Sequence, residues 1–188
     1  MNKQDFNEGL LGFLDASPTP FHATLNMSMM LSNAGFIKLS EIDKWELAQG
    51  KKYYVTRNDS SIIAFTYTQA KNYTMVGAHT DSPNLKLKPN PVIKEHGVVK
   101  FGVEPYGGVL LNPWFDRDLS LAGRVSYLDS NNTIQDTLIN VQKPIAVIAS
   151  LAIHLEREVN EGKKINAQTD ILPILTTNED FDFDDFIK

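Results

Sequence analysis

The spacing of apolar residues along this sequence changes near Gly35. Before this glycine, residues such as Phe6 and Leu10 recur at the three- or four-residue spacing of an amphipathic helix. The prolines of Ser17–Pro20 divide this region into two helices, because proline and the residue before it resist the helical conformation. After Gly35, β-branched and aromatic runs predict strands. We therefore expect an α/β fold.

Strand signals dominate from residue 52 onward. Residues 52–57 and 61–68 flank the turn signal Asn58–Ser60 and predict a hairpin. Residues 72–78 form a third run that ends in Gly-Ala-His, which suits a buried strand with functional groups at its C-terminal end, where ligands gather in open α/β sheets. Further elements are expected as strands at 98–101, 109–111, 124–128 and 133–141, and as a helix at 151–159.

Composition excludes several classes of protein. The sequence has 188 residues and no cysteine, which excludes a disulfide scaffold, thiolate zinc sites and a cysteine nucleophile. Lys plus Arg number 18 and Asp plus Glu number 23, and this net charge of −5 argues against a nucleic-acid partner bound through a basic face. The most apolar run, 145–155, is far shorter than the roughly 20 residues of a membrane span. With no visible targeting segment, we expect a cytoplasmic protein without a membrane partner.

The segment Gly77–Pro83 carries the clearest chemical signal. His79 stands at the end of a predicted strand, and Asp81 follows two residues later. One imidazole nitrogen can bind a divalent metal while the other donates to a carboxylate, which fixes the tautomer. In an extended segment these residues point to the same side, so a direct hydrogen bond between them requires a bend. Taken alone, the tripeptide is more often an ordinary turn.

Longer runs of sequence favour the metal-binding interpretation. Residues 75–88 resemble the first metal-ligand motif of the aspartyl aminopeptidase family, which includes vacuolar aminopeptidase I. Further runs are similar to motifs of that family in the same order: 16–23, 106–108, 114–125, 151–157 and 171–175. The resemblance extends from about residue 6 to about residue 176.

The resemblance implies an enzyme with two zinc ions per complete site that releases N-terminal Asp or Glu from peptides. It also implies homo-oligomers and an α/β zinc-exopeptidase domain with a β-rich dimerisation domain inserted in it. Residues 1–88 would begin the peptidase domain, and residues 89–176 would form most of the inserted domain. His79 would bind one zinc, Asp81 would orient His79, and His154 would reach substrate in a neighbouring subunit's active site.

The sequence lacks the other catalytic residues that the resemblance implies. The family's bridging aspartate and its Glu-Glu pair lie beyond the inserted domain, and this sequence contains neither motif. Without that part, strand edges and apolar surface should be uncovered, which favours self-association. Two hypotheses remain open: a portion of a zinc aminopeptidase whose activity needs further residues, and a non-catalytic truncated remnant or assembly module.

Two charged segments complete the sequence analysis. Asp116, Arg117 and Asp118 would suit a metal or a substrate terminus, but we favour a structural role in which Arg117 holds the β-rich region by charge-assisted hydrogen bonds. Residues 177–188 contain five acidic residues and are expected to form a solvated acidic tail or frayed helix. The alternative is that the phenylalanines of this tail dock on a partner.

Overall fold

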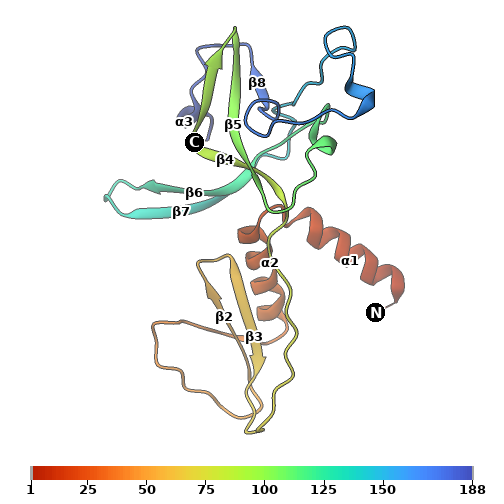
Figure 1. Ribbon diagram of the computed structural model, residues 1–188. Helices are drawn as coiled ribbons and strands as arrows, with labels where there is room; N and C mark the ends of the chain where they lie inside the picture. Colours follow the sequence, from red (N-terminus) through yellow and green to blue (C-terminus); the bar gives the residue numbers. More distant parts are fainter. Residues whose placement is uncertain (1, 188) are drawn as a thin grey trace. The chain divides into compact units, whose positions relative to one another are not determined.

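The computed structural model describes residues 2–187 and divides into two compact units (Figure 1). The first unit comes from Met1–Ser82 and Ala122–Asn140, and the second from Pro83–Leu121 and Val141–Lys188. Helices and strands occur together, so the predicted α/β class is confirmed. No helix within residues 2–187 is long and apolar enough to cross a membrane.

The two predicted helices are present, and local sequence explains where they begin. Helix α1 (Lys3–Asp15) starts with a capping box, in which the Asp5 N–H donates to Asn2 Oδ1 at 2.9 Å and the Asn2 N–H donates back to the Asp5 carboxylate. Helix α2 (Pro20–Asn33) has proline at its first position and Thr19 as its N-cap. Gly35 follows α2 with a φ of +81°, a conformation that glycine adopts without strain.

A three-stranded sheet packs against α2 in the first unit. Strands β1 (Ile37–Leu39), β2 (Lys52–Arg57) and β3 (Ser61–Thr66) lie in that order, with β1 parallel and β3 antiparallel to β2. The predicted β2–β3 hairpin is therefore confirmed. Tyr53 and Tyr54 of β2 are buried, and the Tyr54 hydroxyl lies 3.0 Å from Ser32 Oγ of α2.

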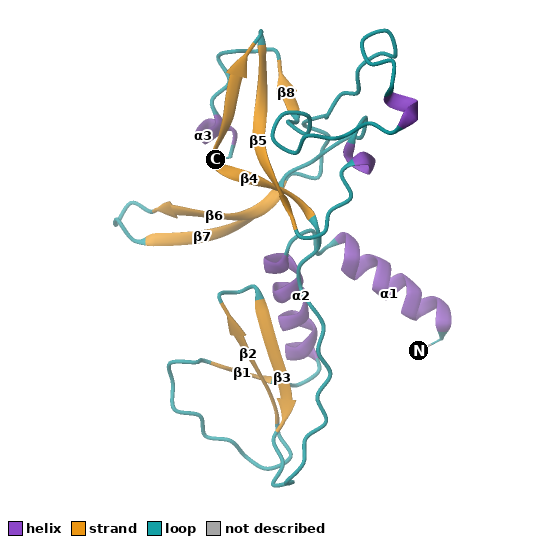
Figure 2. Cartoon of the chain, viewed as in Figure 1, coloured by secondary structure: helices purple, strands orange, loops and turns teal. Residues whose placement is uncertain are grey.

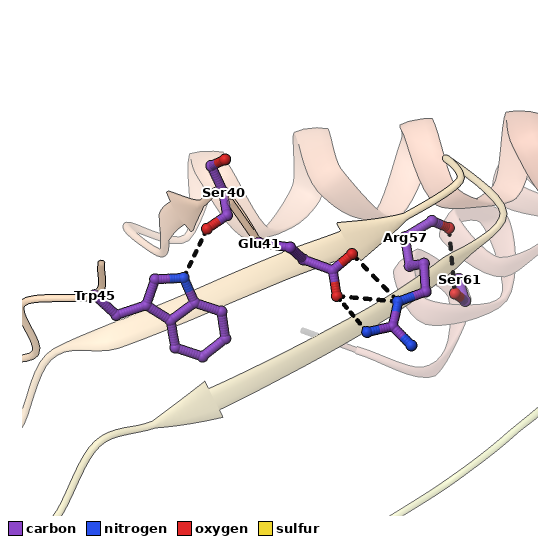
Figure 3. A network of polar contacts seen from close by, with 5 residues as sticks. All are labelled: Ser40, Glu41, Trp45, Arg57 and Ser61. Carbon is purple, nitrogen blue, oxygen red and sulfur yellow. Dashed lines mark hydrogen bonds and ion pairs between the residues drawn. The ribbon is translucent and has the colours of Figure 1, made fainter. Parts of the chain in front are cut away.

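Polar contacts attach the segment after β1 to this sheet (Figure 3). The Arg57 guanidinium of β2 donates to both carboxylate oxygens of Glu41. Trp45 donates from Nε1 to the Ser40 carbonyl at 2.7 Å, and its ring stacks on Phe65 with 6.2 Å between ring centroids. The segment between β1 and β2 is thus ordered by the sheet although it contains no regular element.

A second hairpin contacts the same unit. Strands β6 (Ala122–Leu128) and β7 (Ile134–Asn140) pair antiparallel along their full length. Arg124 of β6 stacks its guanidinium on the Phe21 ring, 4.3 Å from the centroid, and donates to the Asn58 carbonyl in the β2–β3 turn. Through these contacts, the β6–β7 hairpin packs with the N-terminal residues in the first unit.

The second unit is built on a long twisted hairpin. Strands β4 (Asn84–Glu95), β5 (Val98–Tyr106) and β8 (Ile174–Thr176) form a sheet in that order. Its core consists of Phe101, Val103, Ile148 and Ile171, all at most 3% exposed. Short helical segments complete the unit: the 3-10 turns η1 (Asn112–Trp114) and η2 (Val159–Glu161), and helix α3 (Phe183–Phe186).

Three predicted elements are absent from the structure. Residues 72–78 belong to the long loop between β3 and β4, and residues 109–111 also form no strand (Figure 2). A strand requires a neighbour for its backbone hydrogen bonds, and neither run has one among residues 2–187. Residues 151–159 form turns rather than a helix. Leu151 and Leu155 remain 55% and 75% exposed, so the packing that stabilises most protein helices is missing.

The acidic tail is not wholly solvated, contrary to our expectation. Phe183 of α3 packs against the core, with its ring edge-on to Phe101 at 5.6 Å between centroids. Lys94 also donates to the Glu179 carbonyl. The apolar residues of the tail therefore hold it to its own chain while the acidic side chains face solvent.

Candidate metal site

The candidate site lies on the loop that follows β3. Thr80 fixes this loop beside the β2–β3 turn, because its hydroxyl donates to the Ser60 carbonyl at 2.7 Å. His79 and Asp81 flank that anchor. Sequence analysis did not single out Thr80, and no spacing rule would have identified it, because its acceptor is 20 residues away.

The structure brings His79 and Asp81 together through a bend. His79 Nδ1 lies 2.7 Å from the Asp81 backbone carbonyl and 3.3 Å from the Asp81 carboxylate oxygen Oδ1. A carbonyl oxygen can only accept, so Nδ1 is the protonated nitrogen of this imidazole. The lone pair is then on Nε2, the nitrogen left to bind a metal. The backbone carbonyl, rather than the carboxylate, makes the closer contact.

The pair is accessible to other polypeptide groups. The side chain of His79 is 79% exposed and that of Asp81 is 39% exposed. Such exposure allows further ligands to approach His79, but it leaves the imidazole without packing that would hold it in one orientation.

The described residues do not make a zinc site by themselves. Zinc sites in proteins normally use three or four protein ligands. Within residues 2–187, no group of three or more His, Asp or Glu side chains is placed to hold a metal ion. Among these residues, His79 offers one atom with a lone pair, Nε2, to a metal.

His154 belongs to the second unit, whereas His79 and Asp81 belong to the first. His154 lies in the irregular segment after Ser150 and is exposed to solvent. The Ser150 N–H donates to Asp116 Oδ1 at 2.9 Å. Asp116 therefore holds the backbone at Ser150, whereas the side chain of His154 is exposed.

Asp116 has a structural position. Its N–H donates to the Ile148 carbonyl, and its own φ of +54° lies in the left-handed region that aspartate tolerates better than most residues. Hydrogen bonds from the Ser150 side chain and backbone hold the pKa of Asp116 below its ordinary value. This geometry gives Asp116 itself a structural role, in the turn that precedes Arg117.

Comparisons with known proteins assign a family to nearly the whole chain. The model of the family described as aminopeptidase I zinc metalloprotease (M18) matches residues 13–185. A "Probable M18 family aminopeptidase 2" from Pseudomonas paraeruginosa is 51% identical over 177 residues, which are 92% of this chain and 41% of the relative. One from Ectopseudomonas mendocina is 52% identical over the same length. The chain thus spans about two fifths of the curated relatives it matches.

Solved structures agree with the sequence matches. The cryo-EM structure of the Ape4 and Nbr1 complex contains a chain that is 39% identical, with a TM-score of 0.86 over 90% of this chain and 34% of that one. Chaetomium thermophilum mApe1 is 33% identical, with a TM-score of 0.82 over 95% of this chain and 42% of that one. The mApe1 dodecamer from S. cerevisiae is 26% identical, with a TM-score of 0.71 over 95% of this chain and 49% of that one.

Proposed function

Because this chain belongs to the M18 family of zinc metalloproteases and corresponds to its N-terminal portion, we propose that it supplies one zinc ligand, His79, to an aminopeptidase that releases N-terminal Asp or Glu from peptides. The family resemblance inferred from the motifs is thereby confirmed, and with it the class of metallopeptidase. The acidic substrate preference and the roles of individual residues are part of the proposal.

The observation that carries the proposal is the contact between His79 Nδ1 and the Asp81 carbonyl at 2.7 Å. It fixes the tautomer that leaves Nε2 to bind zinc. In a complete site, zinc polarises the scissile carbonyl and lowers the pKa of bound water. The part of this chain in that chemistry is to hold and orient one ligand.

The other parts of the proposal concern assembly. We assign residues 1–88 to the start of the peptidase domain, residues 89–176 to an inserted β-rich domain that joins subunits, and residues 177–188 to a short acidic extension. The dodecameric state given for S. cerevisiae mApe1 supports a homo-oligomer. In such an assembly, exposed His154 would contact the peptide substrate bound by a neighbouring subunit.

Two further parts of the proposal concern the metal and the compartment. A complete site would hold two zinc ions. We place the protein in the cytoplasm.

A chimeric enzyme tests this proposal. Residues 13–185 replace the matching portion of the Pseudomonas paraeruginosa relative, and the chimera is assayed with zinc on peptides that begin with Asp, Glu or Leu. We expect turnover of the acidic peptides that is lost in His79→Ala and kept in His96→Ala, a histidine in the β4–β5 turn. Zinc content and activity unchanged in His79→Ala would refute the assignment of His79.

The second candidate is a non-catalytic assembly module. It is favoured by the lack of a three-ligand group within residues 2–187. The discriminating measurement is the zinc bound by the chimera with and without His79→Ala. Both candidates predict little zinc for the isolated chain, but only the enzymatic one predicts that the chimera binds zinc through His79.

A further inference from the structure

A cavity of about 310 Å³ lies within the first unit, lined by helix α2, strands β1 and β2, the β2–β3 turn and the β6–β7 hairpin. Helix α2 contributes Phe21, Thr24, Leu25 and Ser28, which share one face of the helix because they are three or four residues apart. The volume is at the lower end of the range for small-molecule sites, roughly 300–1,000 Å³. The cavity therefore has room for a small molecule.

One wall of the cavity contains a buried hydroxyl that has no partner. Thr24 is 1% exposed, and its Oγ1 makes no hydrogen bond within residues 2–187. An unsatisfied buried hydroxyl is unfavourable, so native structures usually satisfy such a group with protein, water or ligand. Because Thr24 lines the cavity, a molecule bound there is placed to supply the missing hydrogen bond.

Two charged side chains of opposite sign line the same cavity. Lys38 comes from β1 and Asp59 from the β2–β3 turn, and neither side chain makes an ion pair or hydrogen bond within residues 2–187. The other two charged lining residues already have partners: Arg124 in the contacts described above, and Asp136 in a hydrogen bond from Ser126 Oγ. Lys38 and Asp59 are thus the charges left to pair with a ligand.

A ligand that complements this lining carries both charges and an apolar group. An anion alone would leave Asp59 unpaired, and a cation alone would leave Lys38 unpaired. Leu25 and Leu138 add apolar surface to the lining. A free α-amino acid combines a carboxylate, an ammonium group and a side chain on one carbon atom.

We propose that this cavity binds a free α-amino acid with an apolar side chain. Its carboxylate pairs with Lys38, its ammonium group pairs with Asp59, and the Thr24 hydroxyl makes a hydrogen bond to it. The inference goes beyond the proposed function, because neither His79 nor Asp81 lines the cavity and no metal takes part.

Nuclear magnetic resonance titration of the isotope-labelled 188-residue chain with L-leucine tests the inference, and the spectrum itself shows that the chain is folded. Three probes each lack one feature: isoamylamine lacks the carboxylate, isocaproate lacks the ammonium group, and glycine lacks the apolar side chain. We expect saturable leucine binding with a Kd on the order of 1 mM. The amine and the acid should bind roughly threefold to fivefold more weakly, as for loss of one exposed ion pair. Glycine should bind at least about tenfold more weakly.

Two outcomes of this titration would overturn the inference. One is the absence of saturable leucine binding to the folded chain. The other is equal binding of leucine and all three probes, which would show that the cavity recognises none of the three features.

Variants assign the two charge contacts. Lys38→Gln should abolish the preference for leucine over isoamylamine. Asp59→Asn should abolish the preference for leucine over isocaproate, and asparagine tolerates the φ of +50° at this position. Lys51→Gln and Asp43→Asn are matched controls outside the cavity and should keep both preferences. Preferences that survive in Lys38→Gln and Asp59→Asn would contradict the assignment.

Thr24→Val removes the buried hydroxyl and nearly keeps the shape of the side chain. It should weaken leucine binding about threefold to tenfold without destabilising the chain, whereas Thr24→Ser keeps the hydroxyl and should keep the affinity. A higher thermal midpoint of Thr24→Val with unchanged leucine binding would refute the contact with Thr24. His79→Ala should leave leucine binding unchanged, which separates this inference from the proposed zinc function.

Discussion

Truncating Phe183 to alanine should destabilise the second unit by about 2 kcal/mol. Full burial of a phenylalanine is worth about 3–5 kcal/mol in such substitutions. Phe183 is only partly buried, at the margin of the core, so its truncation should cost roughly half of the lower figure, about 1.5 kcal/mol. Because the pair lies at the margin of the core, its edge-on contact with Phe101, at 5.6 Å between centroids, adds about 0.5 kcal/mol, the low end of the range for aromatic pairs. The sum is close to 2 kcal/mol.

Urea unfolding followed by circular dichroism measures this change, and hydrogen exchange of residues 177–187 shows whether the tail detaches first. Phe186→Ala is the matched control. Phe186 contacts Phe181 and Phe183 but is not among the residues packed on the core, so its truncation should cost less than about 1 kcal/mol. Equal effects of the two substitutions would show that the tail is not anchored through Phe183.

Four further predictions concern three polar residues. Asp116→Ala should lower the urea midpoint more than Asp116→Asn, because asparagine keeps an acceptor for the Ser150 N–H and tolerates the φ of +54°. Hydrogen bonds from Ser150 lower the pKa of Asp116, so the ionised carboxylate stabilises the folded state at neutral pH. This stabilisation is lost as pH falls below the ordinary aspartate range. The urea midpoint of Asp116→Asn should therefore vary less with pH than that of the unmodified chain. Burial lowers the pKa of His22 from 6.5, so neutral His22 contributes to folding stability above pH 6.5. That contribution is lost as pH falls toward the lower pKa of His22 in the folded state. The thermal midpoint of His22→Gln should therefore change less between pH 7 and pH 5 than that of the unmodified chain. In the chimera, Asp81→Ala should weaken zinc binding about tenfold, as measured by competition with a chelator. This is the low end of the effect for residues that orient a metal ligand, because the contact of His79 with the backbone carbonyl survives the substitution. A loss of zinc affinity as large as that of His79→Ala would contradict this reasoning.

The sequence predicted well those features whose causes are local. Helices α1 and α2 begin at capping residues next to their first turns, Asn2 and Thr19, and α2 ends before Gly35. The β2–β3 hairpin follows from its turn, where Asn58 and Asp59 both adopt positive φ values. Each of these signals acts over a few residues, so a reader of the sequence can find it without the rest of the fold.

The candidate site was predictable only in part. The proximity of His79 and Asp81 follows from their separation by one residue, and the motif indicated it. The sequence could not show that the backbone carbonyl makes the closer contact, because this depends on the bend that Thr80 fixes by bonding to Ser60. That anchor exists only once β2 and β3 have folded.

The predictions that failed share one physical cause, which bears on the metal site. Residues 72–78 and 151–159 have the composition of regular elements, but strands and short helices are stabilised mainly by what they pack against. Met75, Val76 and Leu155 are more than 70% exposed, so those partners are absent from the described residues. A zinc site depends on other polypeptide in the same way, since His79 can be poised with the correct tautomer and still bind little metal alone. Zinc affinity should therefore rise when the rest of an M18 chain is present, and His79→Ala should remove that rise.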